Sequence, residues 1–476
     1  MSVLWNIIVF SYCLLALAAI VAELKDNNQP SKTVSWLFVI IVIPVIGILL
    51  WYFFGQNIRR QWIVNRRQLK KLARLETIKY FEQTNITVPK PYDNLVKFFT
   101  SENRAMPFFN NEVTAHLDGY GFFLALLEAI GRAKHHIHII SFIFDDDPLG
   151  KLIRDALIDK ARQGVSIRII YDDMGSWKTK DRFFEVMRKE SIEVQPFLPV
   201  HFPILTSKAN YRNHKKLIVI DGKEGFIGGM NIALRYIKGI DESGIWRDTQ
   251  LQLRGNIVYA MQRIFLIDWH FVTQSAISDA SYYPKMDSSL TDANLLAQVV
   301  TSGPNKETPE IEYGYLKIIN SASKYIYIET PYFIPPENMM KALIVAVESG
   351  VDVRIMTSLH SDSKIIDWVS YSYLREMHEH NIKVYLYQEG FLHSKMLICD
   401  DELVSCGSAN FDFRSFEKNF EANVFMYGET ITNTFKHIFN SDLKKCLPAN
   451  KVTQLTHPTM IVRLRNSIIR LVSPLL

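Results

Sequence analysis

The sequence predicts an α/β fold of two similar halves, each a mixed sheet flanked by helices, preceded by a two-helix transmembrane hairpin. Three observations lead to this fold class. Residues 1–54 contain two long apolar runs, the remaining chain alternates helix-like segments with short apolar strands, and that alternation occurs twice. The length of 476 residues also suits about two or three domains.

The composition indicates a folded protein and leaves its partners open. Hydrophobic residues make up 48% of the chain and charged residues 22%, which argues against a disordered protein. The 54 Lys and Arg residues exceed the 49 Asp and Glu residues by five, an excess that suits an anionic membrane or nucleic acid and requires neither. The cysteines are too sparse for a disulfide framework and show no paired metal-ligand spacing, so we expect a reducing compartment; they are Cys13, Cys399, Cys406 and Cys446.

The two apolar runs predict a hairpin of transmembrane helices over residues 1–54. Val3–Ala22 and Val34–Phe54 are each close to the roughly 20 residues that a helix needs to cross a bilayer. A short polar loop, Glu23–Thr33, joins them. A secretory signal is the alternative for the first run, but that run lacks a basic segment before it and a convincing small-residue cleavage site after it.

The segment after the hairpin is strongly basic and sets the expected orientation. It has no acidic residue until Glu76, and its cations are Arg59, Arg60, Arg66, Arg67, Lys70, Lys71 and Arg74. Because positive charge beside a membrane span stays on the cytoplasmic side, both termini and the long remainder are expected in the cytoplasm. We assign residues 55–105 to a juxtamembrane linker, whose charge is explained more simply by anionic lipid headgroups than by nucleic acid.

The rest of the chain contains an internal repeat. Three pairs of matching positions show its register, and their separation shortens only slightly along the chain: Ile137 with Ile326, Gly164 with Gly350, and His214 with His393. Insertions and deletions in loops produce such a drift. We therefore expect one half in residues 106–285 and the other in residues 286–450, joined by the irregular stretch Thr273–Asn294 and followed by a basic amphipathic tail in residues 451–476.

Each half carries the motif H-x-K-x4-D at the start of an apolar strand. HKKLIVID lies in residues 209–236 and HSKMLICD in residues 388–415, and each leads to a small-residue turn with an asparagine at the same distance after the histidine. Two matches in register within an independently visible repeat argue against chance. The expected catalytic residues are His214, Lys216, Asp221, His393, Lys395 and Asp400.

These residue types suit phosphodiester chemistry. On a strand, residues two apart project to the same face, so each histidine points with its lysine. A neutral imidazole is a competent nucleophile, and a lysine supplies positive charge to phosphoryl oxygens without a metal. An imidazole from the other half can protonate a leaving alkoxide and later deprotonate an incoming hydroxyl. The turns are expected to bring amide donors to the same phosphate; the phosphate-binding candidates are Gly229, Asn231, Ser408 and Asn410.

A catalytic imidazole also needs its second ring nitrogen held, usually by a carboxylate. The sequence WRDT places Asp248 downstream of His214, and KNFEAN places Glu421 at a similar distance downstream of His393. These are the candidate orienting carboxylates. The sequence leaves open which of them holds which histidine.

The doubled motif resembles the phospholipase D superfamily, whose mark is a repeated H-x-K-x4-D followed by a Gly/Ser-rich turn with asparagine. The resemblance extends from about Leu117 to Phe439. It implies that the two halves pack about a pseudo-two-fold axis, that one histidine forms a covalent phosphohistidine while the other acts as acid and base, and that no metal or cofactor takes part. The superfamily usually gives the nucleophile to the first motif, here His214.

Within the superfamily, the layout is similar to that of the bacterial cardiolipin synthases. The similar features are the hairpin with IPVIGILLWYFFG, the basic linker, the stretches WRDT and DFRSFEKNFEAN, and a tail ending RLVSPLL. This similarity implies a multi-pass enzyme of a bacterial cell membrane with no nucleic-acid partner. It also implies phosphatidyl transfer from one phosphatidylglycerol to another, giving cardiolipin and glycerol, with His214 as nucleophile and His393 as acid and base.

Other functions remain open from the residues alone. A hydrolytic phospholipase D would use the same groups with water as acceptor, and a phosphatidylserine synthase would use serine with CDP-diacylglycerol as donor. A non-catalytic lipid-binding scaffold would keep the fold without the chemistry. A nuclease is disfavoured because two membrane spans would serve it no obvious purpose.

Three further patterns have two interpretations each. The cluster His135, His136 and His138 suits a metal, but on an alternating strand ordinary surface and core positions explain it better. Asp145–Asp147 and Asp172–Asp173 stand where strands should end, as solvated loops or as contacts to a headgroup. The tail fits a helix on the membrane or one packed on the second half; its apolar residues Ile461, Leu464, Ile468, Leu471 and Leu475 recur among Arg463, Arg465 and Arg470.

Overall fold

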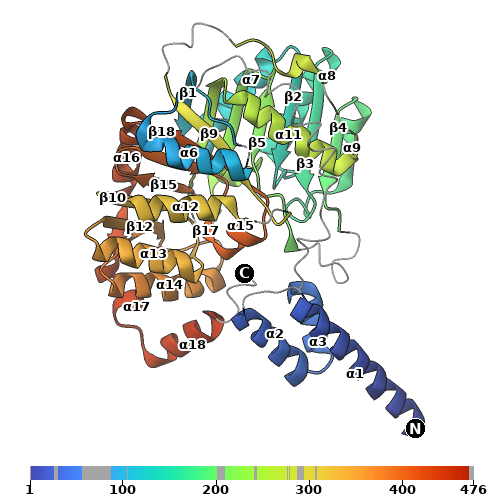
Figure 1. Cartoon of the computed structure of the whole chain (residues 1–476). Helices are drawn as coiled ribbons and strands as arrows, with labels where there is room; N and C mark the ends of the chain where they lie inside the picture. The colour runs from blue at the N-terminus through green and yellow to red at the C-terminus, as the bar shows by residue number, and fades with distance from the viewer. Residues whose placement is uncertain are drawn as a thin grey trace.

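The computed structural model describes residues 2–25, 30–55, 87–103, 105–200, 210–240, 244–275, 277, 279–286, 294–305 and 308–470. These residues form two layered α/β units, with a group of helices projecting from them at the N-terminus (Figure 1). The cations of the basic linker, Arg59 to Arg74, and the tail residues Leu471 and Leu475 lie outside the described residues.

The first apolar run forms one long helix, α1 (Ser2–Lys25), which contains an 18-residue stretch with a mean hydropathy of 2.4. The second run is divided into α2 (Pro30–Val42), α3 (Ile46–Leu50) and the π-helical turn η1 (Trp51–Gly55). Pro44 cannot donate a helical hydrogen bond, and Val45 has a positive φ of 64°. Within the described segments one helix is therefore long and apolar enough to cross a membrane, where the sequence predicted two continuous spans.

The divided second run nevertheless folds back on α1. Ala19, Ile40 and Trp51 are buried against one another, and the indole Nε1 of Trp51 donates a hydrogen bond to Glu23 Oε2 at 2.9 Å. The Tyr12 hydroxyl also donates to the carbonyl of Ile40. The N-terminal helices thus form one packed hairpin-like unit of unequal arms.

The first half is built on a seven-stranded mixed sheet in the order β1-β8-β6-β5-β2-β3-β4. Its strands are β1 (Asn111–His116), β2 (His136–Ser141), β3 (Ser166–Asp172), β4 (Glu193–Phe197), β5 (Leu217–Ile220), β6 (Glu224–Gly228) and β8 (Gln250–Gly255). Its helices are α7 (Gly119–Arg132), α8 (Pro148–Arg162), α9 (Asp181–Lys189), α10 (Arg235–Lys238) and α11 (Val258–Thr273).

The second half is built on an eight-stranded mixed sheet in the order β19-β13-β12-β10-β15-β16-β18-β9. Its strands are β9 (Leu296–Ser302), β10 (Tyr325–Glu329), β12 (Asp352–Ser358), β13 (Lys383–Tyr387), β15 (Met396–Cys399), β16 (Leu403–Gly407), β18 (Glu421–Tyr427) and β19 (Cys446–Pro448). Its helices are α12 (Glu310–Ser321), α13 (Glu337–Glu348), α14 (Lys364–Glu379), α15 (Phe413–Glu417), α16 (Glu429–Leu443), α17 (Thr453–Thr456) and α18 (Met460–Arg470).

The two sheets repeat one topology, which confirms the internal repeat. The run β8-β6-β5-β2-β3-β4 matches the run β18-β16-β15-β10-β12-β13 strand for strand. In both runs the last three strands are parallel and the motif strand, β5 or β15, is antiparallel to its neighbours. Each motif histidine therefore precedes the same strand in its own sheet.

A shared core joins the two halves. It contains side chains from the facing sides of both sheets, such as Val219 and Leu251 from the first and Ile398 and Val424 from the second. Helices α11 and α16 contribute to the same core, and each half has a further core on its other face. Burial of this two-sided apolar surface fixes the halves relative to each other.

Two short parallel pairings cross between the halves beside the motifs. Strand β7 (Trp246–Arg247) pairs with β14 (Phe391–Leu392), directly before His393. Asn213, directly before His214, forms an isolated parallel bridge with Phe420. Each motif is therefore attached to a segment of the opposite half.

Helix α6 (Lys90–Asn103) lies in the stretch that the sequence assigned to the linker, and it packs on the second half. Phe99 is fully buried, with its ring 4.4 Å from the ring of Phe425 between centroids. A Cβ on Gly314 of α12 would lie 2.3 Å from the Phe99 ring, so a glycine is required for this close approach.

The tail helix α18 packs on α14 while leaving an apolar face exposed. Arg470 forms an ion pair with Glu376 at 2.7 Å, and the Arg465 guanidinium lies over the Trp368 ring. Ile461 is 80% exposed, and Leu464 and Ile468 are exposed as well. Packing on the second half is thus the arrangement found for this helix.

Candidate active site

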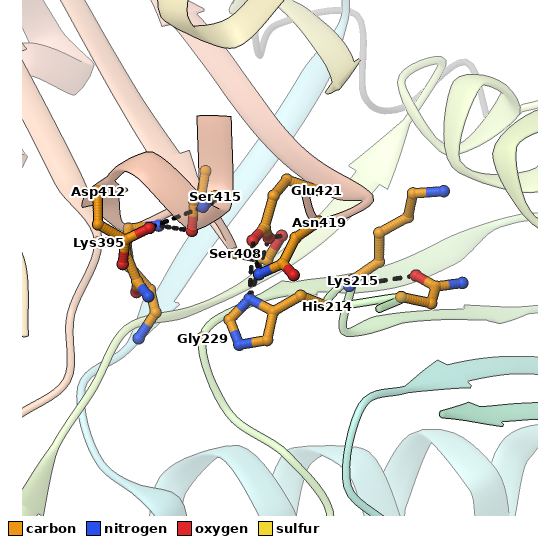
Figure 2. Close-up of polar contacts among 12 residues, drawn as sticks. His214, Lys215, Gly229, Lys395, Ser408, Asp412, Ser415, Asn419 and Glu421 are labelled. Atoms are coloured by element: carbon orange, nitrogen blue, oxygen red, sulfur yellow. Dashed lines mark hydrogen bonds and ion pairs between the residues drawn. The ribbon is translucent and has the colours of Figure 1, made fainter. Parts of the chain in front are cut away.

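His214 is held by groups of the second half. Its backbone N–H donates to the Phe420 carbonyl at 2.9 Å, and its ring Nδ1 lies 3.0 and 3.1 Å from the two carboxylate oxygens of Glu421. Glu421 is fully buried and accepts further hydrogen bonds from Ser408 Oγ at 2.5 Å and from Asn419 Nδ2 at 3.2 Å. Figure 2 shows these three side chains gathered beside the His214 ring. The ring orientation is thereby fixed.

His393 is held by groups of the first half in the same way. Its backbone N–H donates to the Arg247 carbonyl at 2.7 Å, and its ring Nδ1 lies 2.6 Å from Asp248 Oδ2. Asp248 is fully buried, and its other oxygen accepts the backbone N–H of Thr249 at 2.7 Å. The carboxylates are therefore exchanged between the halves, which answers the question of pairing that the sequence left open.

This arrangement favours neutral imidazoles with Nε2 available. Because each carboxylate accepts the Nδ1 proton, the lone pair of each ring is placed on Nε2. Burial lowers the pKa of His214 to about 4 and that of His393 to about 3. Burial opposes ionisation of Asp248 and Glu421 too, but the neighbouring lysines and histidines hold the pKa of each carboxyl below its usual value. The rings are thus neutral bases beside ionised acids near pH 7.

The two motif lysines are buried and lie close enough to affect each other electrostatically. Lys216 Nζ donates to the carbonyl of His214 at 2.7 Å, and Lys395 Nζ donates to the carbonyl of His393. Burial lowers the pKa of Lys395 to about 8 and that of Lys216 well below its usual range, and the charge of Lys395 lowers the pKa of Lys216 further. An anion bound between them would remove that repulsion.

Asp221 and Asp400 lie at the opposite ends of the motif strands from the histidines, outside the group of residues that lines the cavity described below. The Asp221 carboxylate accepts three backbone N–H groups, those of residues 134–136 at 2.7 to 2.9 Å. Asp400 does the same for residues 323–325. Both aspartates therefore tie the end of a motif strand to the start of the neighbouring strand.

The four predicted phosphate-binding residues divide into two pairs. Gly229 and Ser408 lie against the orienting carboxylates: a Cβ on Gly229 would be 2.2 Å from Asp248 Oδ1, and Ser408 donates to Glu421. The backbone N–H of Gly229 donates to the carbonyl of Thr249, directly before β8, and that of Ser408 donates to the carbonyl of Ala422 in β18. Asn231 and Asn410 instead line the cavity.

Both histidines line one cavity of about 290 Å³ between the halves. Its remaining lining is Phe142, Ile143, Arg212, Asn231, Arg235, Tyr236, Trp246, Tyr332, Ile334, Asp362, Ile366, Asn410, Asp412, Phe413, Arg414 and Asn419. Aromatic rings shape it beside the imidazoles, with Phe142 at 4.9 Å from the His214 ring and Trp246 at 5.1 Å from the His393 ring between centroids. A mixed polar and aromatic cavity of this size suits a lipid headgroup better than a long acyl chain.

Several of these lining residues were not identified from the sequence. Phe142 follows a predicted strand as an ordinary apolar residue, so nothing in the local pattern marks it. The arginines did leave a signal, because Arg235 follows Asn231 at the same spacing as Arg414 follows Asn410. The doubled motif therefore extends to N-x3-R in both halves, a signal that is present in the sequence.

The aspartate pairs and the histidine cluster have structural contacts. Asp172 does not lie in a solvated loop: it is fully buried and accepts the backbone N–H of Asn213 at 2.8 Å, so it holds the residue directly before the first motif histidine. His136 and His138 are fully buried and both hydrogen-bond to the side chain of Gln262. The interpretation of those histidines as core positions is confirmed for these two.

A buried ionic network crosses between the halves next to Asp248. Arg247 donates from Nη1 to the Asp248 carbonyl at 2.8 Å, and its Nη2 lies 2.7 Å from Asp442 Oδ2 in α16. Glu329 lies at 4.0 Å from the same guanidinium, and burial raises its pKa to about 8. Arg247 thus links the segment that carries one orienting carboxylate to the second half.

Comparisons with known proteins agree with this geometry. The family model described as "Cardiolipin synthase, PLD-like domain" matches residues 126–269 and 315–443, and the model described as "Phospholipase_D-nuclease N-terminal" matches residues 14–56. The "Major cardiolipin synthase ClsA" of Bacillus subtilis is 36% identical over 474 residues, which cover 97% of both chains. "Cardiolipin synthase 1" of Staphylococcus aureus (strain COL) is 36% identical over 475 residues, 97% of this chain and 95% of the relative.

A solved structure shows the same fold in a more distant protein. The phosphatidylserine synthase of Haemophilus influenzae superimposes with a TM-score of 0.62 at 14% sequence identity, covering 80% of this chain and 100% of that one. At this identity the likeness concerns the fold alone.

Proposed function

Because the chain belongs to the cardiolipin synthase family of phospholipase D-like phosphatidyltransferases, we propose that it converts two phosphatidylglycerol molecules into cardiolipin and glycerol through a phosphatidyl-histidine. The observation that carries this proposal is the pair of imidazoles in one cavity, each held by a buried carboxylate of the opposite half. Each ring presents Nε2 for chemistry, so the imidazole itself can serve as the nucleophile.

In the first step Nε2 of His214 attacks the phosphorus of one phosphatidylglycerol. A P–N bond forms, and the P–O bond to the terminal glycerol breaks. The negative charge of the bound phosphate offsets the positive charges of Lys216 and Lys395, which lower the pKa of His393, and His393 takes up a proton from solvent at Nε2 while Nδ1 stays bonded to Asp248. His393 then gives its Nε2 proton to the departing glycerol oxygen.

In the second step the free glycerol hydroxyl of another phosphatidylglycerol gives its proton to Nε2 of His393. Its oxygen attacks the phosphorus, the P–N bond to His214 breaks, and cardiolipin leaves. His214 is then neutral again, and His393 again carries the Nε2 proton that it held when the first lipid was bound. The reaction exchanges one phosphodiester for another, so it is reversible.

The remaining site residues have supporting roles in this proposal. Lys216 and Lys395 stabilise the phosphoryl charge, and the side chains of Asn231 and Asn410 bind phosphoryl oxygens from the cavity wall. Gly229 and Ser408 act through the carboxylates that they contact. Asp221 and Asp400 act at a distance, by fixing the motif strands.

We assign the enzyme to a bacterial cell membrane, with α1 as one span, the segments α2 and α3 as the second arm, and both termini with the catalytic halves in the cytoplasm. The apolar helix α1 and the basic residues after Gly55 support this topology. The reciprocal contacts of the motifs support a pseudo-two-fold relation between halves divided near residue 286.

Product analysis tests the proposed reaction. Purified full-length enzyme in phosphatidylglycerol vesicles is expected to release glycerol and form cardiolipin in equal molar amounts, and a His214→Ala variant is expected to form neither. Accumulation of phosphatidic acid without cardiolipin would instead make water the acceptor and would contradict the transferase assignment.

A further inference from the structure

The two halves place matching arginines in the cavity. Arg235 and Arg414 each follow the motif histidine of their half at the same spacing (235 − 214 equals 414 − 393), and both line the cavity. Arg235 is the first residue of the short helix α10, and Arg414 is the second residue of the short helix α15. Each helix follows the motif turn of its half. The two arginines therefore occupy equivalent positions of the repeat.

The two arginines differ in their acidic partners. Arg235 forms an ion pair with Asp145, with 2.5 Å between Nη2 and Oδ2. The Arg414 side chain makes no hydrogen bond or ion pair with any residue that the structure describes. One half therefore pairs its arginine with an acid, and the other leaves its arginine without an ion pair among the described residues.

The backbone register identifies the residue that replaces Asp145 in the second half. Phe144 forms a parallel bridge with Ile232, and Phe333 pairs in parallel with Phe411 at the equivalent place. The backbone N–H groups of Phe144 and Phe333 each donate to a serine hydroxyl that follows the next strand of the sheet, Ser176 after β3 and Ser370 after β12. The following residue is Asp145 in the first half and Ile334 in the second, so an apolar side chain stands where Arg414 would find its acid.

The surroundings of Arg414 contain acids, Asp412, Asp172 and Glu421, but each of these carboxylates is bonded to other groups. The acid that acts on it most strongly is Asp412, whose carboxylate accepts the Ser415 N–H at 2.7 Å and caps α15. Figure 2 shows Asp412 turned to Ser415 beside Lys395. Burial raises the pKa of Asp412 and lowers the pKa of Arg414. A partly buried cation on a cavity wall without its own counter-ion is suited to receive an anion.

The proposed reaction brings two lipid phosphates to the site, one from the donor and one from the accepting lipid. Only the donor phosphate reacts. The donor phosphate is attacked at His214 and is compensated by Lys216 and Lys395. The accepting lipid brings a second phosphodiester, which stays intact and needs a cation away from the reacting phosphorus. We propose that Arg414 binds the phosphate of the accepting phosphatidylglycerol and so selects an anionic lipid over water or a neutral alcohol as acceptor. This inference rests on the proposed function.

Two assays on the same full-length enzyme separate donor and acceptor. Exchange of radiolabelled glycerol into phosphatidylglycerol uses the donor site with a neutral acceptor, whereas cardiolipin formation also needs the accepting lipid. A charged hydrogen bond contributes about 1.5–3 kcal/mol, so Arg414→Gln should lower the ratio of cardiolipin formation to glycerol exchange by about 10- to 100-fold. Arg414→Lys should recover part of that ratio.

Two further variants test whether the missing acidic partner of Arg414 explains the ratio of cardiolipin formation to glycerol exchange. Ile334→Asp places an acid at the position equivalent to Asp145, so it should lower the ratio in the same direction as Arg414→Gln. Arg235→Gln is the matched control, because that arginine already has an acidic partner; its ratio should stay within about twofold of the wild-type ratio.

The outcomes distinguish this proposal from the proposed function. If Arg414→Gln lowers both activities equally, or leaves their ratio unchanged, Arg414 does not bind the acceptor phosphate. If the unmodified enzyme shows neither glycerol exchange nor cardiolipin formation, the proposed reaction itself fails. A thermal unfolding midpoint of Arg414→Gln well below that of the wild type would show that Arg414 is structural, and would overturn the proposal too.

Discussion

The ring of His393 is held by a carboxylate from the other half of the chain, with 2.6 Å between its Nδ1 and Asp248 Oδ2. Glu421 makes the reciprocal contact with His214. Neither half can therefore position its own histidine without the other. A single half of this enzyme is expected to be inactive even where it folds.

Because Asp248 and Glu421 hold different histidines, substitutions at these two carboxylates should separate proton transfer by His393 from nucleophilic attack by His214. Asp248→Asn should impair His393 as acid, and Glu421→Gln should impair His214 as nucleophile, each by about 10²- to 10⁴-fold in kcat with phosphatidylglycerol. A phosphatidyl p-nitrophenol substrate needs no acid for its leaving group. With that substrate, Asp248→Asn should still give a burst of p-nitrophenol, and Glu421→Gln should not.

His393→Gln and His214→Gln are the controls for this test. Each should behave as the carboxylate variant that is bonded to that histidine in the structure. A burst from Glu421→Gln together with none from Asp248→Asn would mean that the nucleophile and the acid have been assigned the wrong way round.

The close approach of Gly229 to Asp248 predicts strong sensitivity to one methyl group. A Cβ there would lie 2.2 Å from Asp248 Oδ1, so Gly229→Ala should displace the carboxylate and reduce glycerol release at least about 100-fold. A Cβ on Gly131 of α7 meets no atom within 4 Å, which makes Gly131→Ala the matched control. Equal activity of the two variants would show that Asp248 need not stay in place.

Ser408→Ala removes one of the hydrogen bonds that hold Glu421. Because Asn419 and His214 still contact that carboxylate, a loss of about 10- to 100-fold is expected, measured as the initial rate of cardiolipin formation. The loss should appear in kcat rather than in KM. A change confined to KM would mean that Ser408 binds lipid directly.

The buried lysine predicts an alkaline limit to activity. Burial lowers the pKa of Lys395 to about 8, so this side chain loses its positive charge as pH rises through that value. The kcat/KM for the phosphatidyl p-nitrophenol substrate, which reports the free enzyme and needs no proton from His393, should therefore fall above about pH 8. The neutral nucleophile His214, with a pKa of about 4, should produce no acid limit near pH 6.5. A profile that stays level to pH 10 would contradict the assignment of the charge to Lys395.

The buried pair of Arg247 and Asp442 predicts a stability effect at the junction of the halves. Arg247→Leu leaves Asp442 buried without its partner and should lower the free energy of unfolding by roughly 3–5 kcal/mol, measured by denaturant titration in detergent. The double variant with Asp442→Leu should recover part of the loss. Lys97→Ala, which removes an exposed ion pair with Asp93, should change the free energy of unfolding by less than about 1 kcal/mol. A similar effect of Arg247→Leu and Lys97→Ala would exclude a role for the buried pair.

The sequence predicted the parts of the fold that depend on periodicity. The repeat, the mixed sheets and the doubled motif were readable because strands and helices each have their own apolar period and because the two copies could be compared. The second membrane run was predicted as continuous, since hydropathy does not register the break at Pro44 and Val45.

The site depended on contacts that no local pattern contains. Asp248 and Glu421 were recognisable as carboxylates near the motifs, but their exchange between the halves follows from pairings such as Asn213 with Phe420, which lie far apart in the chain. Asp221 belongs to the motif by spacing, yet its side chain binds backbone N–H groups at the far end of β5. Spacing along a strand shows which residues recur, and tertiary packing decides which of them reach the cavity.

The central claim is that His214 carries the phosphatidyl group while His393 moves the proton. Full-length enzyme mixed with radiolabelled phosphatidylglycerol, quenched within the first turnover and digested under alkaline conditions, should yield one labelled peptide containing His214. The His393→Gln variant with the p-nitrophenol substrate should accumulate the same adduct. A label on His393, or cardiolipin formation with no labelled peptide at any time, would contradict this mechanism.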